Sequence, residues 1–182
     1  MATTAPSILS LIAAGLYLVV LAACVAGSLA ARKFRQPADH WRTWAIVAIG
    51  FLALALVRIA GFEEAAREAL REMLALEGTY ESRRSFQRPL AAGLLAIISA
   101  AVALGLLRQW YLARGRRNVA VVVGLAGLAV MVMMVGLRII SLHQLDTLLY
   151  GPLKLNWIID LSTSVTVLGA AVMYIRYVSQ RP

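Results

Sequence analysis

Long apolar segments alternate with short polar ones along the whole chain. A helix needs about 20 apolar residues to cross the roughly 30 Å hydrocarbon core of a bilayer. Segments of that length and character cover residues 7–29, 43–61, 89–107, 118–137 and 155–175. The pattern predicts an all-α fold, a bundle of five transmembrane helices that forms a single domain over residues 1–182. Pro89 is placed to open the third helix, because proline suits a first helical turn.

A second apolar periodicity continues beyond the second predicted span. Over residues 62–77, apolar side chains recur at spacings of three and four residues, which is the pattern of an amphipathic helix. Its apolar positions include Phe62, Leu70, Met73 and Leu76. We expect this helix to lie on the outer membrane face. A more specific alternative is that it binds a partner chain. The polar residues 78–88 that follow are predicted to be an outer loop.

Residues 43–78 and 118–151 share an order of features that suggests an internal duplication. Each segment contains an apolar span, then an Arg-Ile pair at Arg58 or Arg138, and then a helical continuation outside the membrane. Parallel repeats occur in some transporters. Duplication of a helical hairpin also produces them without any transport role, so the repeat alone indicates no function.

Composition and charge place these spans in a bilayer and orient them. The chain is 61% hydrophobic, above the roughly 45–50% of ordinary soluble domains. Most of the basic residues behind its net charge of +9 lie in segments 31–42 and 107–117 and in the C-terminal tail. These segments share one side of the membrane, so the positive-inside rule predicts an outside N-terminus and a cytoplasmic C-terminus. Because these charges serve as topology signals, no nucleic-acid partner is expected.

Composition also suggests a location for the protein, and the local sequence around the single cysteine suggests its role. Abundant alanine and arginine with little lysine suggest a multi-pass protein of a bacterial inner membrane. The stretch Leu-Ala-Ala-Cys that ends at Cys24 resembles the cleavage signal of a lipoprotein. No basic segment precedes it, however, as such a signal requires, so a buried helix thiol is the favoured interpretation.

Charged residues recur near the outer ends of three predicted spans. At a rise of about 1.5 Å per residue, Arg58, Arg138 and Asp160 all fall within the outer third of the bilayer. Asn156 and a run of hydroxyl-bearing residues accompany Asp160. A charge at this depth is costly unless it is paired, hydrated or able to reach the interface. Either an arginine pairs with Asp160 to fix the bundle, or the layer lines a site for an ion, lipid headgroup or small anion, or it contacts a partner subunit.

A histidine and an aspartate offer candidate metal ligands beside this layer. His143 and Asp146 are three residues apart and share a helix face, and Glu63 adds a third ligand of suitable type. A hydrogen-bonded pair has the same spacing, so the pattern requires neither metal nor haem. The other histidine, His40, lies about 30 Å away on the cytoplasmic side, which disfavours a haem held by two histidines of this chain.

The chain lacks the short motifs that mark common catalytic sites. It contains no Gly-rich phosphate loop, HExxH, CxxC or GxSxG, which favours a role other than catalysis. The leading hypothesis is a small integral accessory subunit or assembly protein of a larger inner-membrane complex, in contact with lipids and with other subunits or copies of itself. One alternative is a small transporter or an anion- or lipid-binding protein that uses the outer arginine–aspartate layer. Another is a metal- or haem-binding redox protein centred on His143.

Overall fold

Five long helices make up the part of the chain that the computed structural model describes, residues 8–60, 80–140 and 155–180. They are α1 (Ile8–Lys33), α2 (Ala38–Ile59), α4 (Tyr80–Leu112), α5 (Arg116–Ile140) and α7 (Leu155–Ser179). Each is long and apolar enough to cross a membrane. The prediction of an all-helical, multi-pass membrane protein is therefore confirmed, and each helix overlaps one predicted span.

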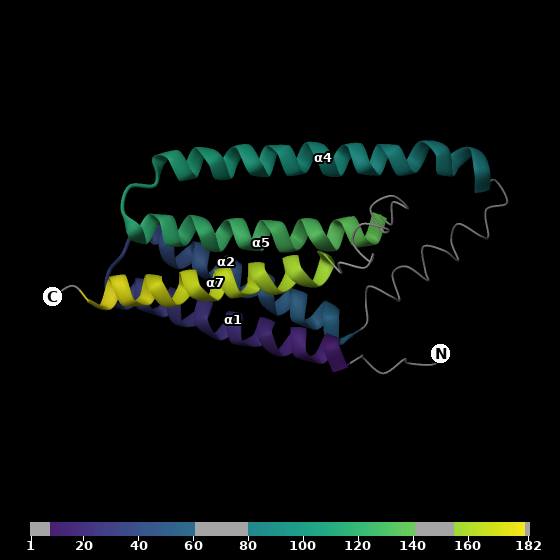
Figure 1. Cartoon of the computed structure of the whole chain (residues 1–182). Coiled ribbons are helices and arrows are strands. Elements are labelled where there is room, and N and C mark those ends of the chain that lie inside the picture. Colours follow the sequence, from purple (N-terminus) through teal and green to yellow (C-terminus); the bar gives the residue numbers. More distant parts are fainter. Residues whose placement is uncertain (1–7, 61–79, 141–154, 181–182) are drawn as a thin grey trace.

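Four of the helices form the core of the bundle, and α4 lies beside it. α1 packs against α2 and α7, and α5 packs against α7 and α2, whereas the main contact of α4 is with α5. Successive helices run antiparallel, so the α1–α2 and α4–α5 loops and the end of α7 share one end of the bundle (Figure 1). The first and last helices of the described chain thus lie side by side.

A tryptophan ring joins the four core helices. Trp44 of α2 is fully buried, and Cβ atoms added at Gly27 of α1 and Gly124 of α5 would lie 3.4 Å and 2.9 Å from its ring. The ring of Tyr174 in α7 lies 5.4 Å from the Trp44 ring, centre to centre. Lipid tails are as apolar as the helices, so membrane helices associate largely through such close packing, which small residues permit.

Most of the remaining core is apolar. Val20 and Cys24 of α1, Phe51 of α2 and Val167 of α7 have no exposed surface. Cys24, the single cysteine of the sequence, therefore occupies a packed position inside the bundle.

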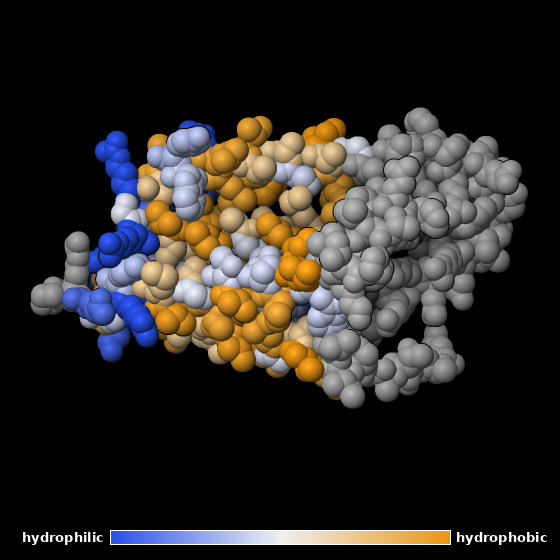
Figure 2. Space-filling view, viewed as in Figure 1, coloured by the Kyte–Doolittle hydropathy of each residue, from blue (hydrophilic) through white to orange (hydrophobic). Residues whose placement is uncertain are grey.

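The surface divides into an apolar belt and a basic end. Figure 2 shows apolar side chains around the middle of the bundle and hydrophilic ones gathered at the end where α1 and α7 finish. The exposed basic residues at this end are Arg32, Lys33, Arg35, Arg42, Arg108, Arg114, Arg116 and Arg176. Aromatic side chains of the kind that favour the headgroup level, Trp41 and Trp110, lie at the same end.

The structure differs from the sequence-based expectation at the start of α4. This helix begins at Tyr80, so Pro89 lies inside it and not in its first turn, and residues 80–88 are helical instead of forming a loop. Polarity was the wrong criterion here, because the glutamate, arginines and glutamine of this stretch all have high helix propensity.

Two other predictions fall on segments that the structure does not describe. The amphipathic helix at residues 62–77 and the helical continuation after Arg138 lie outside the described residues, either wholly or in large part. The internal duplication that joins residues 43–78 and 118–151 accordingly stays a prediction.

Candidate functional site

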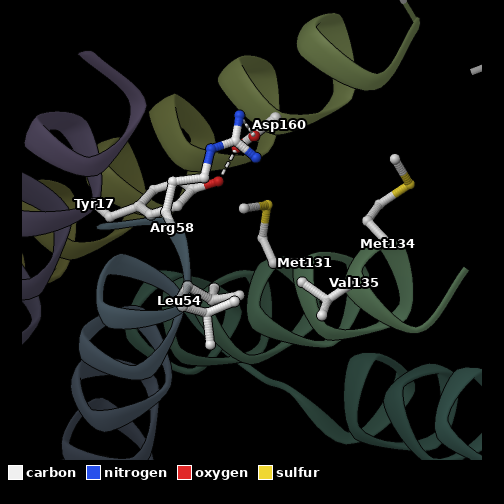
Figure 3. Close-up of a pocket in the computed structure, with 8 residues that line it drawn as sticks. Tyr17, Leu54, Arg58, Met131, Met134, Val135 and Asp160 are labelled. Atoms are coloured by element: carbon white, nitrogen blue, oxygen red, sulfur yellow. Dashed lines mark hydrogen bonds and ion pairs between the residues drawn. The ribbon is translucent and has the colours of Figure 1, made fainter. Parts of the chain in front are cut away.

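Three polar side chains from three helices meet inside the apolar bundle. Asp160 of α7 is 4% exposed, and its Oδ1 atom accepts a hydrogen bond from the Tyr17 hydroxyl of α1 at 2.5 Å. The Nη2 atom of Arg58 in α2 lies 3.8 Å from Oδ2 of the same carboxylate. Figure 3 shows Tyr17 and Arg58 both directed at Asp160. We call these three residues the polar cluster.

A fourth residue supports the arginine of the cluster. The Arg58 guanidinium lies over the Trp157 ring, 5.3 Å from its centre, so the negative face of the indole faces the cation. Trp157 and Asp160 are three residues apart on α7, which places the ring and the carboxylate on the same side of that helix. One helix thus supplies both the counter-charge and the aromatic platform for Arg58.

The contacts within the polar cluster lower the free-energy cost of placing a charge inside a bilayer. An unpaired charge near the bilayer centre costs several kcal/mol, and a charge of opposite sign with additional hydrogen bonds offsets much of that cost. Here the carboxylate has the guanidinium on one oxygen and the phenol on the other. Because its members come from α1, α2 and α7, the cluster also fixes how these helices are positioned relative to one another.

The space beside the cluster is small. A cavity of about 10 Å³ is lined by the cluster and by Leu54, Val57, Met131, Met134 and Val135 (Figure 3). That volume corresponds to about one water molecule, whereas sites for small-molecule ligands usually measure ~300–1,000 Å³. In this conformation the cluster is therefore packed between helices and is not part of an open ligand pocket.

The hydroxyl groups that follow Asp160 do not form a polar wall. Ser162 Oγ donates to the carbonyl of Ile159 at 3.2 Å, and Thr166 Oγ1 donates to the carbonyl of Ser162 at 2.7 Å. Both side chains are exposed on α7 and bond to their own helix backbone. Ser164, by contrast, is fully buried in the core.

The structure places only some of the predicted site residues. It brings Arg58 and Asp160 together, while the side chains of Arg138 and Asn156 lie outside the described set. Also outside the described residues are the candidate metal ligands His143, Asp146 and Glu63 and the predicted surface-helix residues Phe62, Leu70, Met73 and Leu76. Within the described ranges, no three histidine, cysteine, aspartate or glutamate side chains are grouped as metal ligands.

Sequence reasoning missed Tyr17. The available signal was a tyrosine in the middle of an apolar span, because a buried phenol usually finds a hydrogen-bond partner. Its partner lies 143 positions further along the chain, so no local pattern connects the two residues.

Fold and site together define a multi-pass helical membrane protein whose bundle is closed around a buried ionic cluster. Comparison of the chain with known protein families, with curated proteins and with solved structures finds no match.

Proposed function

We propose that this protein is an accessory or assembly subunit of a larger membrane complex, and that α4 is the helix that contacts its partner. The observation that carries the proposal is the exposure of α4. No residue of its candidate span, Gly93–Leu112, is buried, whereas the other four helices each bury about a third of theirs. Leu94, Ile97 and Leu104 are 59%, 69% and 67% exposed.

The small residues of α4 support a protein neighbour for this helix. In the core, the spaces beside Gly50, Gly124 and Gly127 are filled by side chains of adjacent helices. On α4, a Cβ atom added at Gly93 or Gly105 would meet nothing within 4 Å, as is also true at Gly15 of α1 and Gly169 of α7. Small residues let a second backbone approach closely in lipid, so these positions suit a transmembrane helix of another chain.

The closed polar cluster also favours a structural role over transport. An arginine–aspartate pair that is buried in the core and bonded to a third helix holds the bundle together without leaving room for a substrate. The surface of α4, by contrast, is exposed, and its main packing contact among the described helices is with α5.

The proposal includes an orientation and a location. The N-terminus faces outward and the C-terminus lies in the cytoplasm of a bacterium, with the protein in the inner membrane. Support comes from the basic residues of the α1–α2 loop, the α4–α5 loop and the end of α7, which share one end of the bundle (Figure 2).

Photo-crosslinking from native membranes tests the proposal. A photoreactive amino acid replaces Ile97 or Leu104 on α4 in the full-length chain, and Val165, which is 54% exposed on α7, provides a matched control. We expect a crosslinked protein of one discrete mass from both α4 positions and none from position 165. Native mass spectrometry of the mildly solubilised protein should show a stoichiometric particle of the same composition. A mass of one chain, together with equally weak crosslinking from all three positions, contradicts the proposal.

A further inference from the structure

A cleft opens at the basic end of the bundle, far along the helices from the polar cluster. It lies between the α1–α2 loop, the start of α5 and the end of α7, and its volume is about 510 Å³. Its walls include Gln36, His40, Arg114, Arg116, Arg117 and Tyr177. This volume falls within the range of small-molecule sites, unlike that of the cavity beside Asp160.

The walls of the cleft carry positive charge that no acidic lining residue balances. Three arginines line it, and none of its lining residues is an aspartate or glutamate. The nearest acid in sequence, Asp39, precedes His40 but is exposed and does not line the cleft. The cleft therefore has the electrostatic character of an anion site.

Contacts between the three walls hold several of the lining side chains in place. Arg117 Nη1 donates to Gln36 Oε1 at 2.9 Å, which links the start of α5 to the α1–α2 loop. The Arg116 guanidinium lies 5.9 Å from the centre of the Tyr177 ring. His40 is 8% exposed, and its Nδ1 atom is 3.1 Å from the hydroxyl of the fully buried Tyr174. Side chains held in this way lose little freedom when a ligand binds.

The backbone at the start of α5 adds further hydrogen-bond donors for an anion. α5 begins at Arg116, directly after Gly115, whose φ of 90° is in the left-handed region that favours glycine. The amide hydrogens of a first helical turn have no carbonyl partner within the helix, and glycine offers no side chain to cap them. No acidic residue occupies this turn. The first turn of α5 thus presents N–H groups and a partial positive charge beside the arginines.

We propose that this cleft binds a phosphate group. A guanidinium fork matches the oxygens of phosphate, and a helix N-terminus complements its charge, so the two features together favour phosphate over a simple halide. Trp41 and Trp110 at the same end indicate that the cleft lies at headgroup level, within reach of an anionic phospholipid as well as of a soluble phosphate. The inference rests on the cleft alone and is independent of the role of α4.

The test compares two phosphate sources on the delipidated full-length protein in detergent. Native mass spectrometry measures binding of phosphatidylglycerol against phosphatidylcholine, whose phosphate is balanced by a choline. The shift in thermal unfolding with added inorganic phosphate measures the soluble source. The variant Arg114→Gln/Arg116→Gln removes two cleft arginines, and Arg108→Gln/Arg176→Gln removes the same charge from exposed positions at the same end that do not line the cleft. Arg114→Gln alone provides a milder version of the first variant.

The possible outcomes distinguish a lipid headgroup from a soluble phosphate, and both from failure of the proposal. Preferential binding of phosphatidylglycerol that weakens at least about tenfold in the cleft variant, but not in its control, supports a lipid headgroup as the occupant. A phosphate-dependent rise in unfolding temperature that only the cleft variant loses supports a soluble phosphate. Equal losses in both double variants, or no binding of either probe to the unmodified protein, overturn the proposal, because the charge would then act only as a diffuse basic face.

Discussion

At the scale of single residues, the buried carboxylate of Asp160 is the most consequential group in the bundle. It is 4% exposed, accepts a hydrogen bond from α1 and pairs with a cation of α2. Removing one member of such a buried pair leaves the other charge uncompensated, whereas replacing both by apolar side chains of similar size often has little effect. The cluster is thus expected to behave as a unit in mutagenesis.

We predict that Arg58→Met and Asp160→Leu each destabilise the protein by about 3 kcal/mol, and that the double variant loses less than either single one. The physical reason is that only the single variants retain an uncompensated charge inside the bundle. Thermal unfolding in detergent, arranged as a double-mutant cycle, measures the coupling. Strictly additive losses would show that Arg58 and Asp160 do not act as a pair.

At the scale of elements, the length of the apolar segments predicted the helices, and the structure corrected the start of one of them, α4. Continuous segments of about 20 apolar residues suffice to locate membrane-crossing helices, because the thickness of the bilayer fixes their length. Residues 80–88 were assigned to a loop since polarity was weighed above helix propensity. The rise per residue predicted one shared depth for Arg58 and Asp160, and the structure brings these two side chains together.

Which helices pack against one another could not be predicted in the same way. The bond between Tyr17 and Asp160 depends on α1 lying against α7, and nothing in either segment specifies that neighbour. The cleft at the basic end was missed for a similar reason. Its arginines were understood as topology signals, and their convergence with His40 and Tyr177 arises only when three separate segments fold to one end.

Close packing at Gly124 gives a prediction at this scale. We expect Gly124→Ala to be about 2 kcal/mol less stable than Gly105→Ala. Alanine has the same intrinsic helix advantage at both positions, but at position 124 its Cβ would lie 2.9 Å from the buried Trp44 ring, while position 105 is open. Thermal unfolding of the two variants checks this difference. Equal stabilities would mean that the Trp44 ring adjusts without cost.

At the scale of the whole molecule, the basic end of the described bundle predicts its orientation in the membrane. The single native cysteine is buried, so an introduced cysteine can be labelled against a low background. Ala38 is exposed at the basic end and Ala60 is exposed at the end of α2, which makes the two positions a matched pair.

We predict that a membrane-impermeant maleimide labels Ala60→Cys in intact bacterial cells, and labels Ala38→Cys only after the cells are permeabilised. The positive-inside rule is the reason, because it keeps the arginine-rich end in the cytoplasm. Gel-shift quantification of labelled protein reads the result. The reverse pattern would invert the proposed topology, and labelling of the unmodified protein would show that Cys24 is reachable.

The partnership between α1, α2 and α7 also has a consequence for biosynthesis. Asp160 lies in the last described helix, so it is translated after Tyr17 and Arg58 have emerged from the ribosome. Until α7 is inserted, a nascent chain holds Arg58 in the membrane without the carboxylate that balances it. We therefore expect chains that stop before residue 155 to be substrates for membrane proteases. The Arg58–Asp160 pair would then link the survival of the growing chain to the insertion of α7.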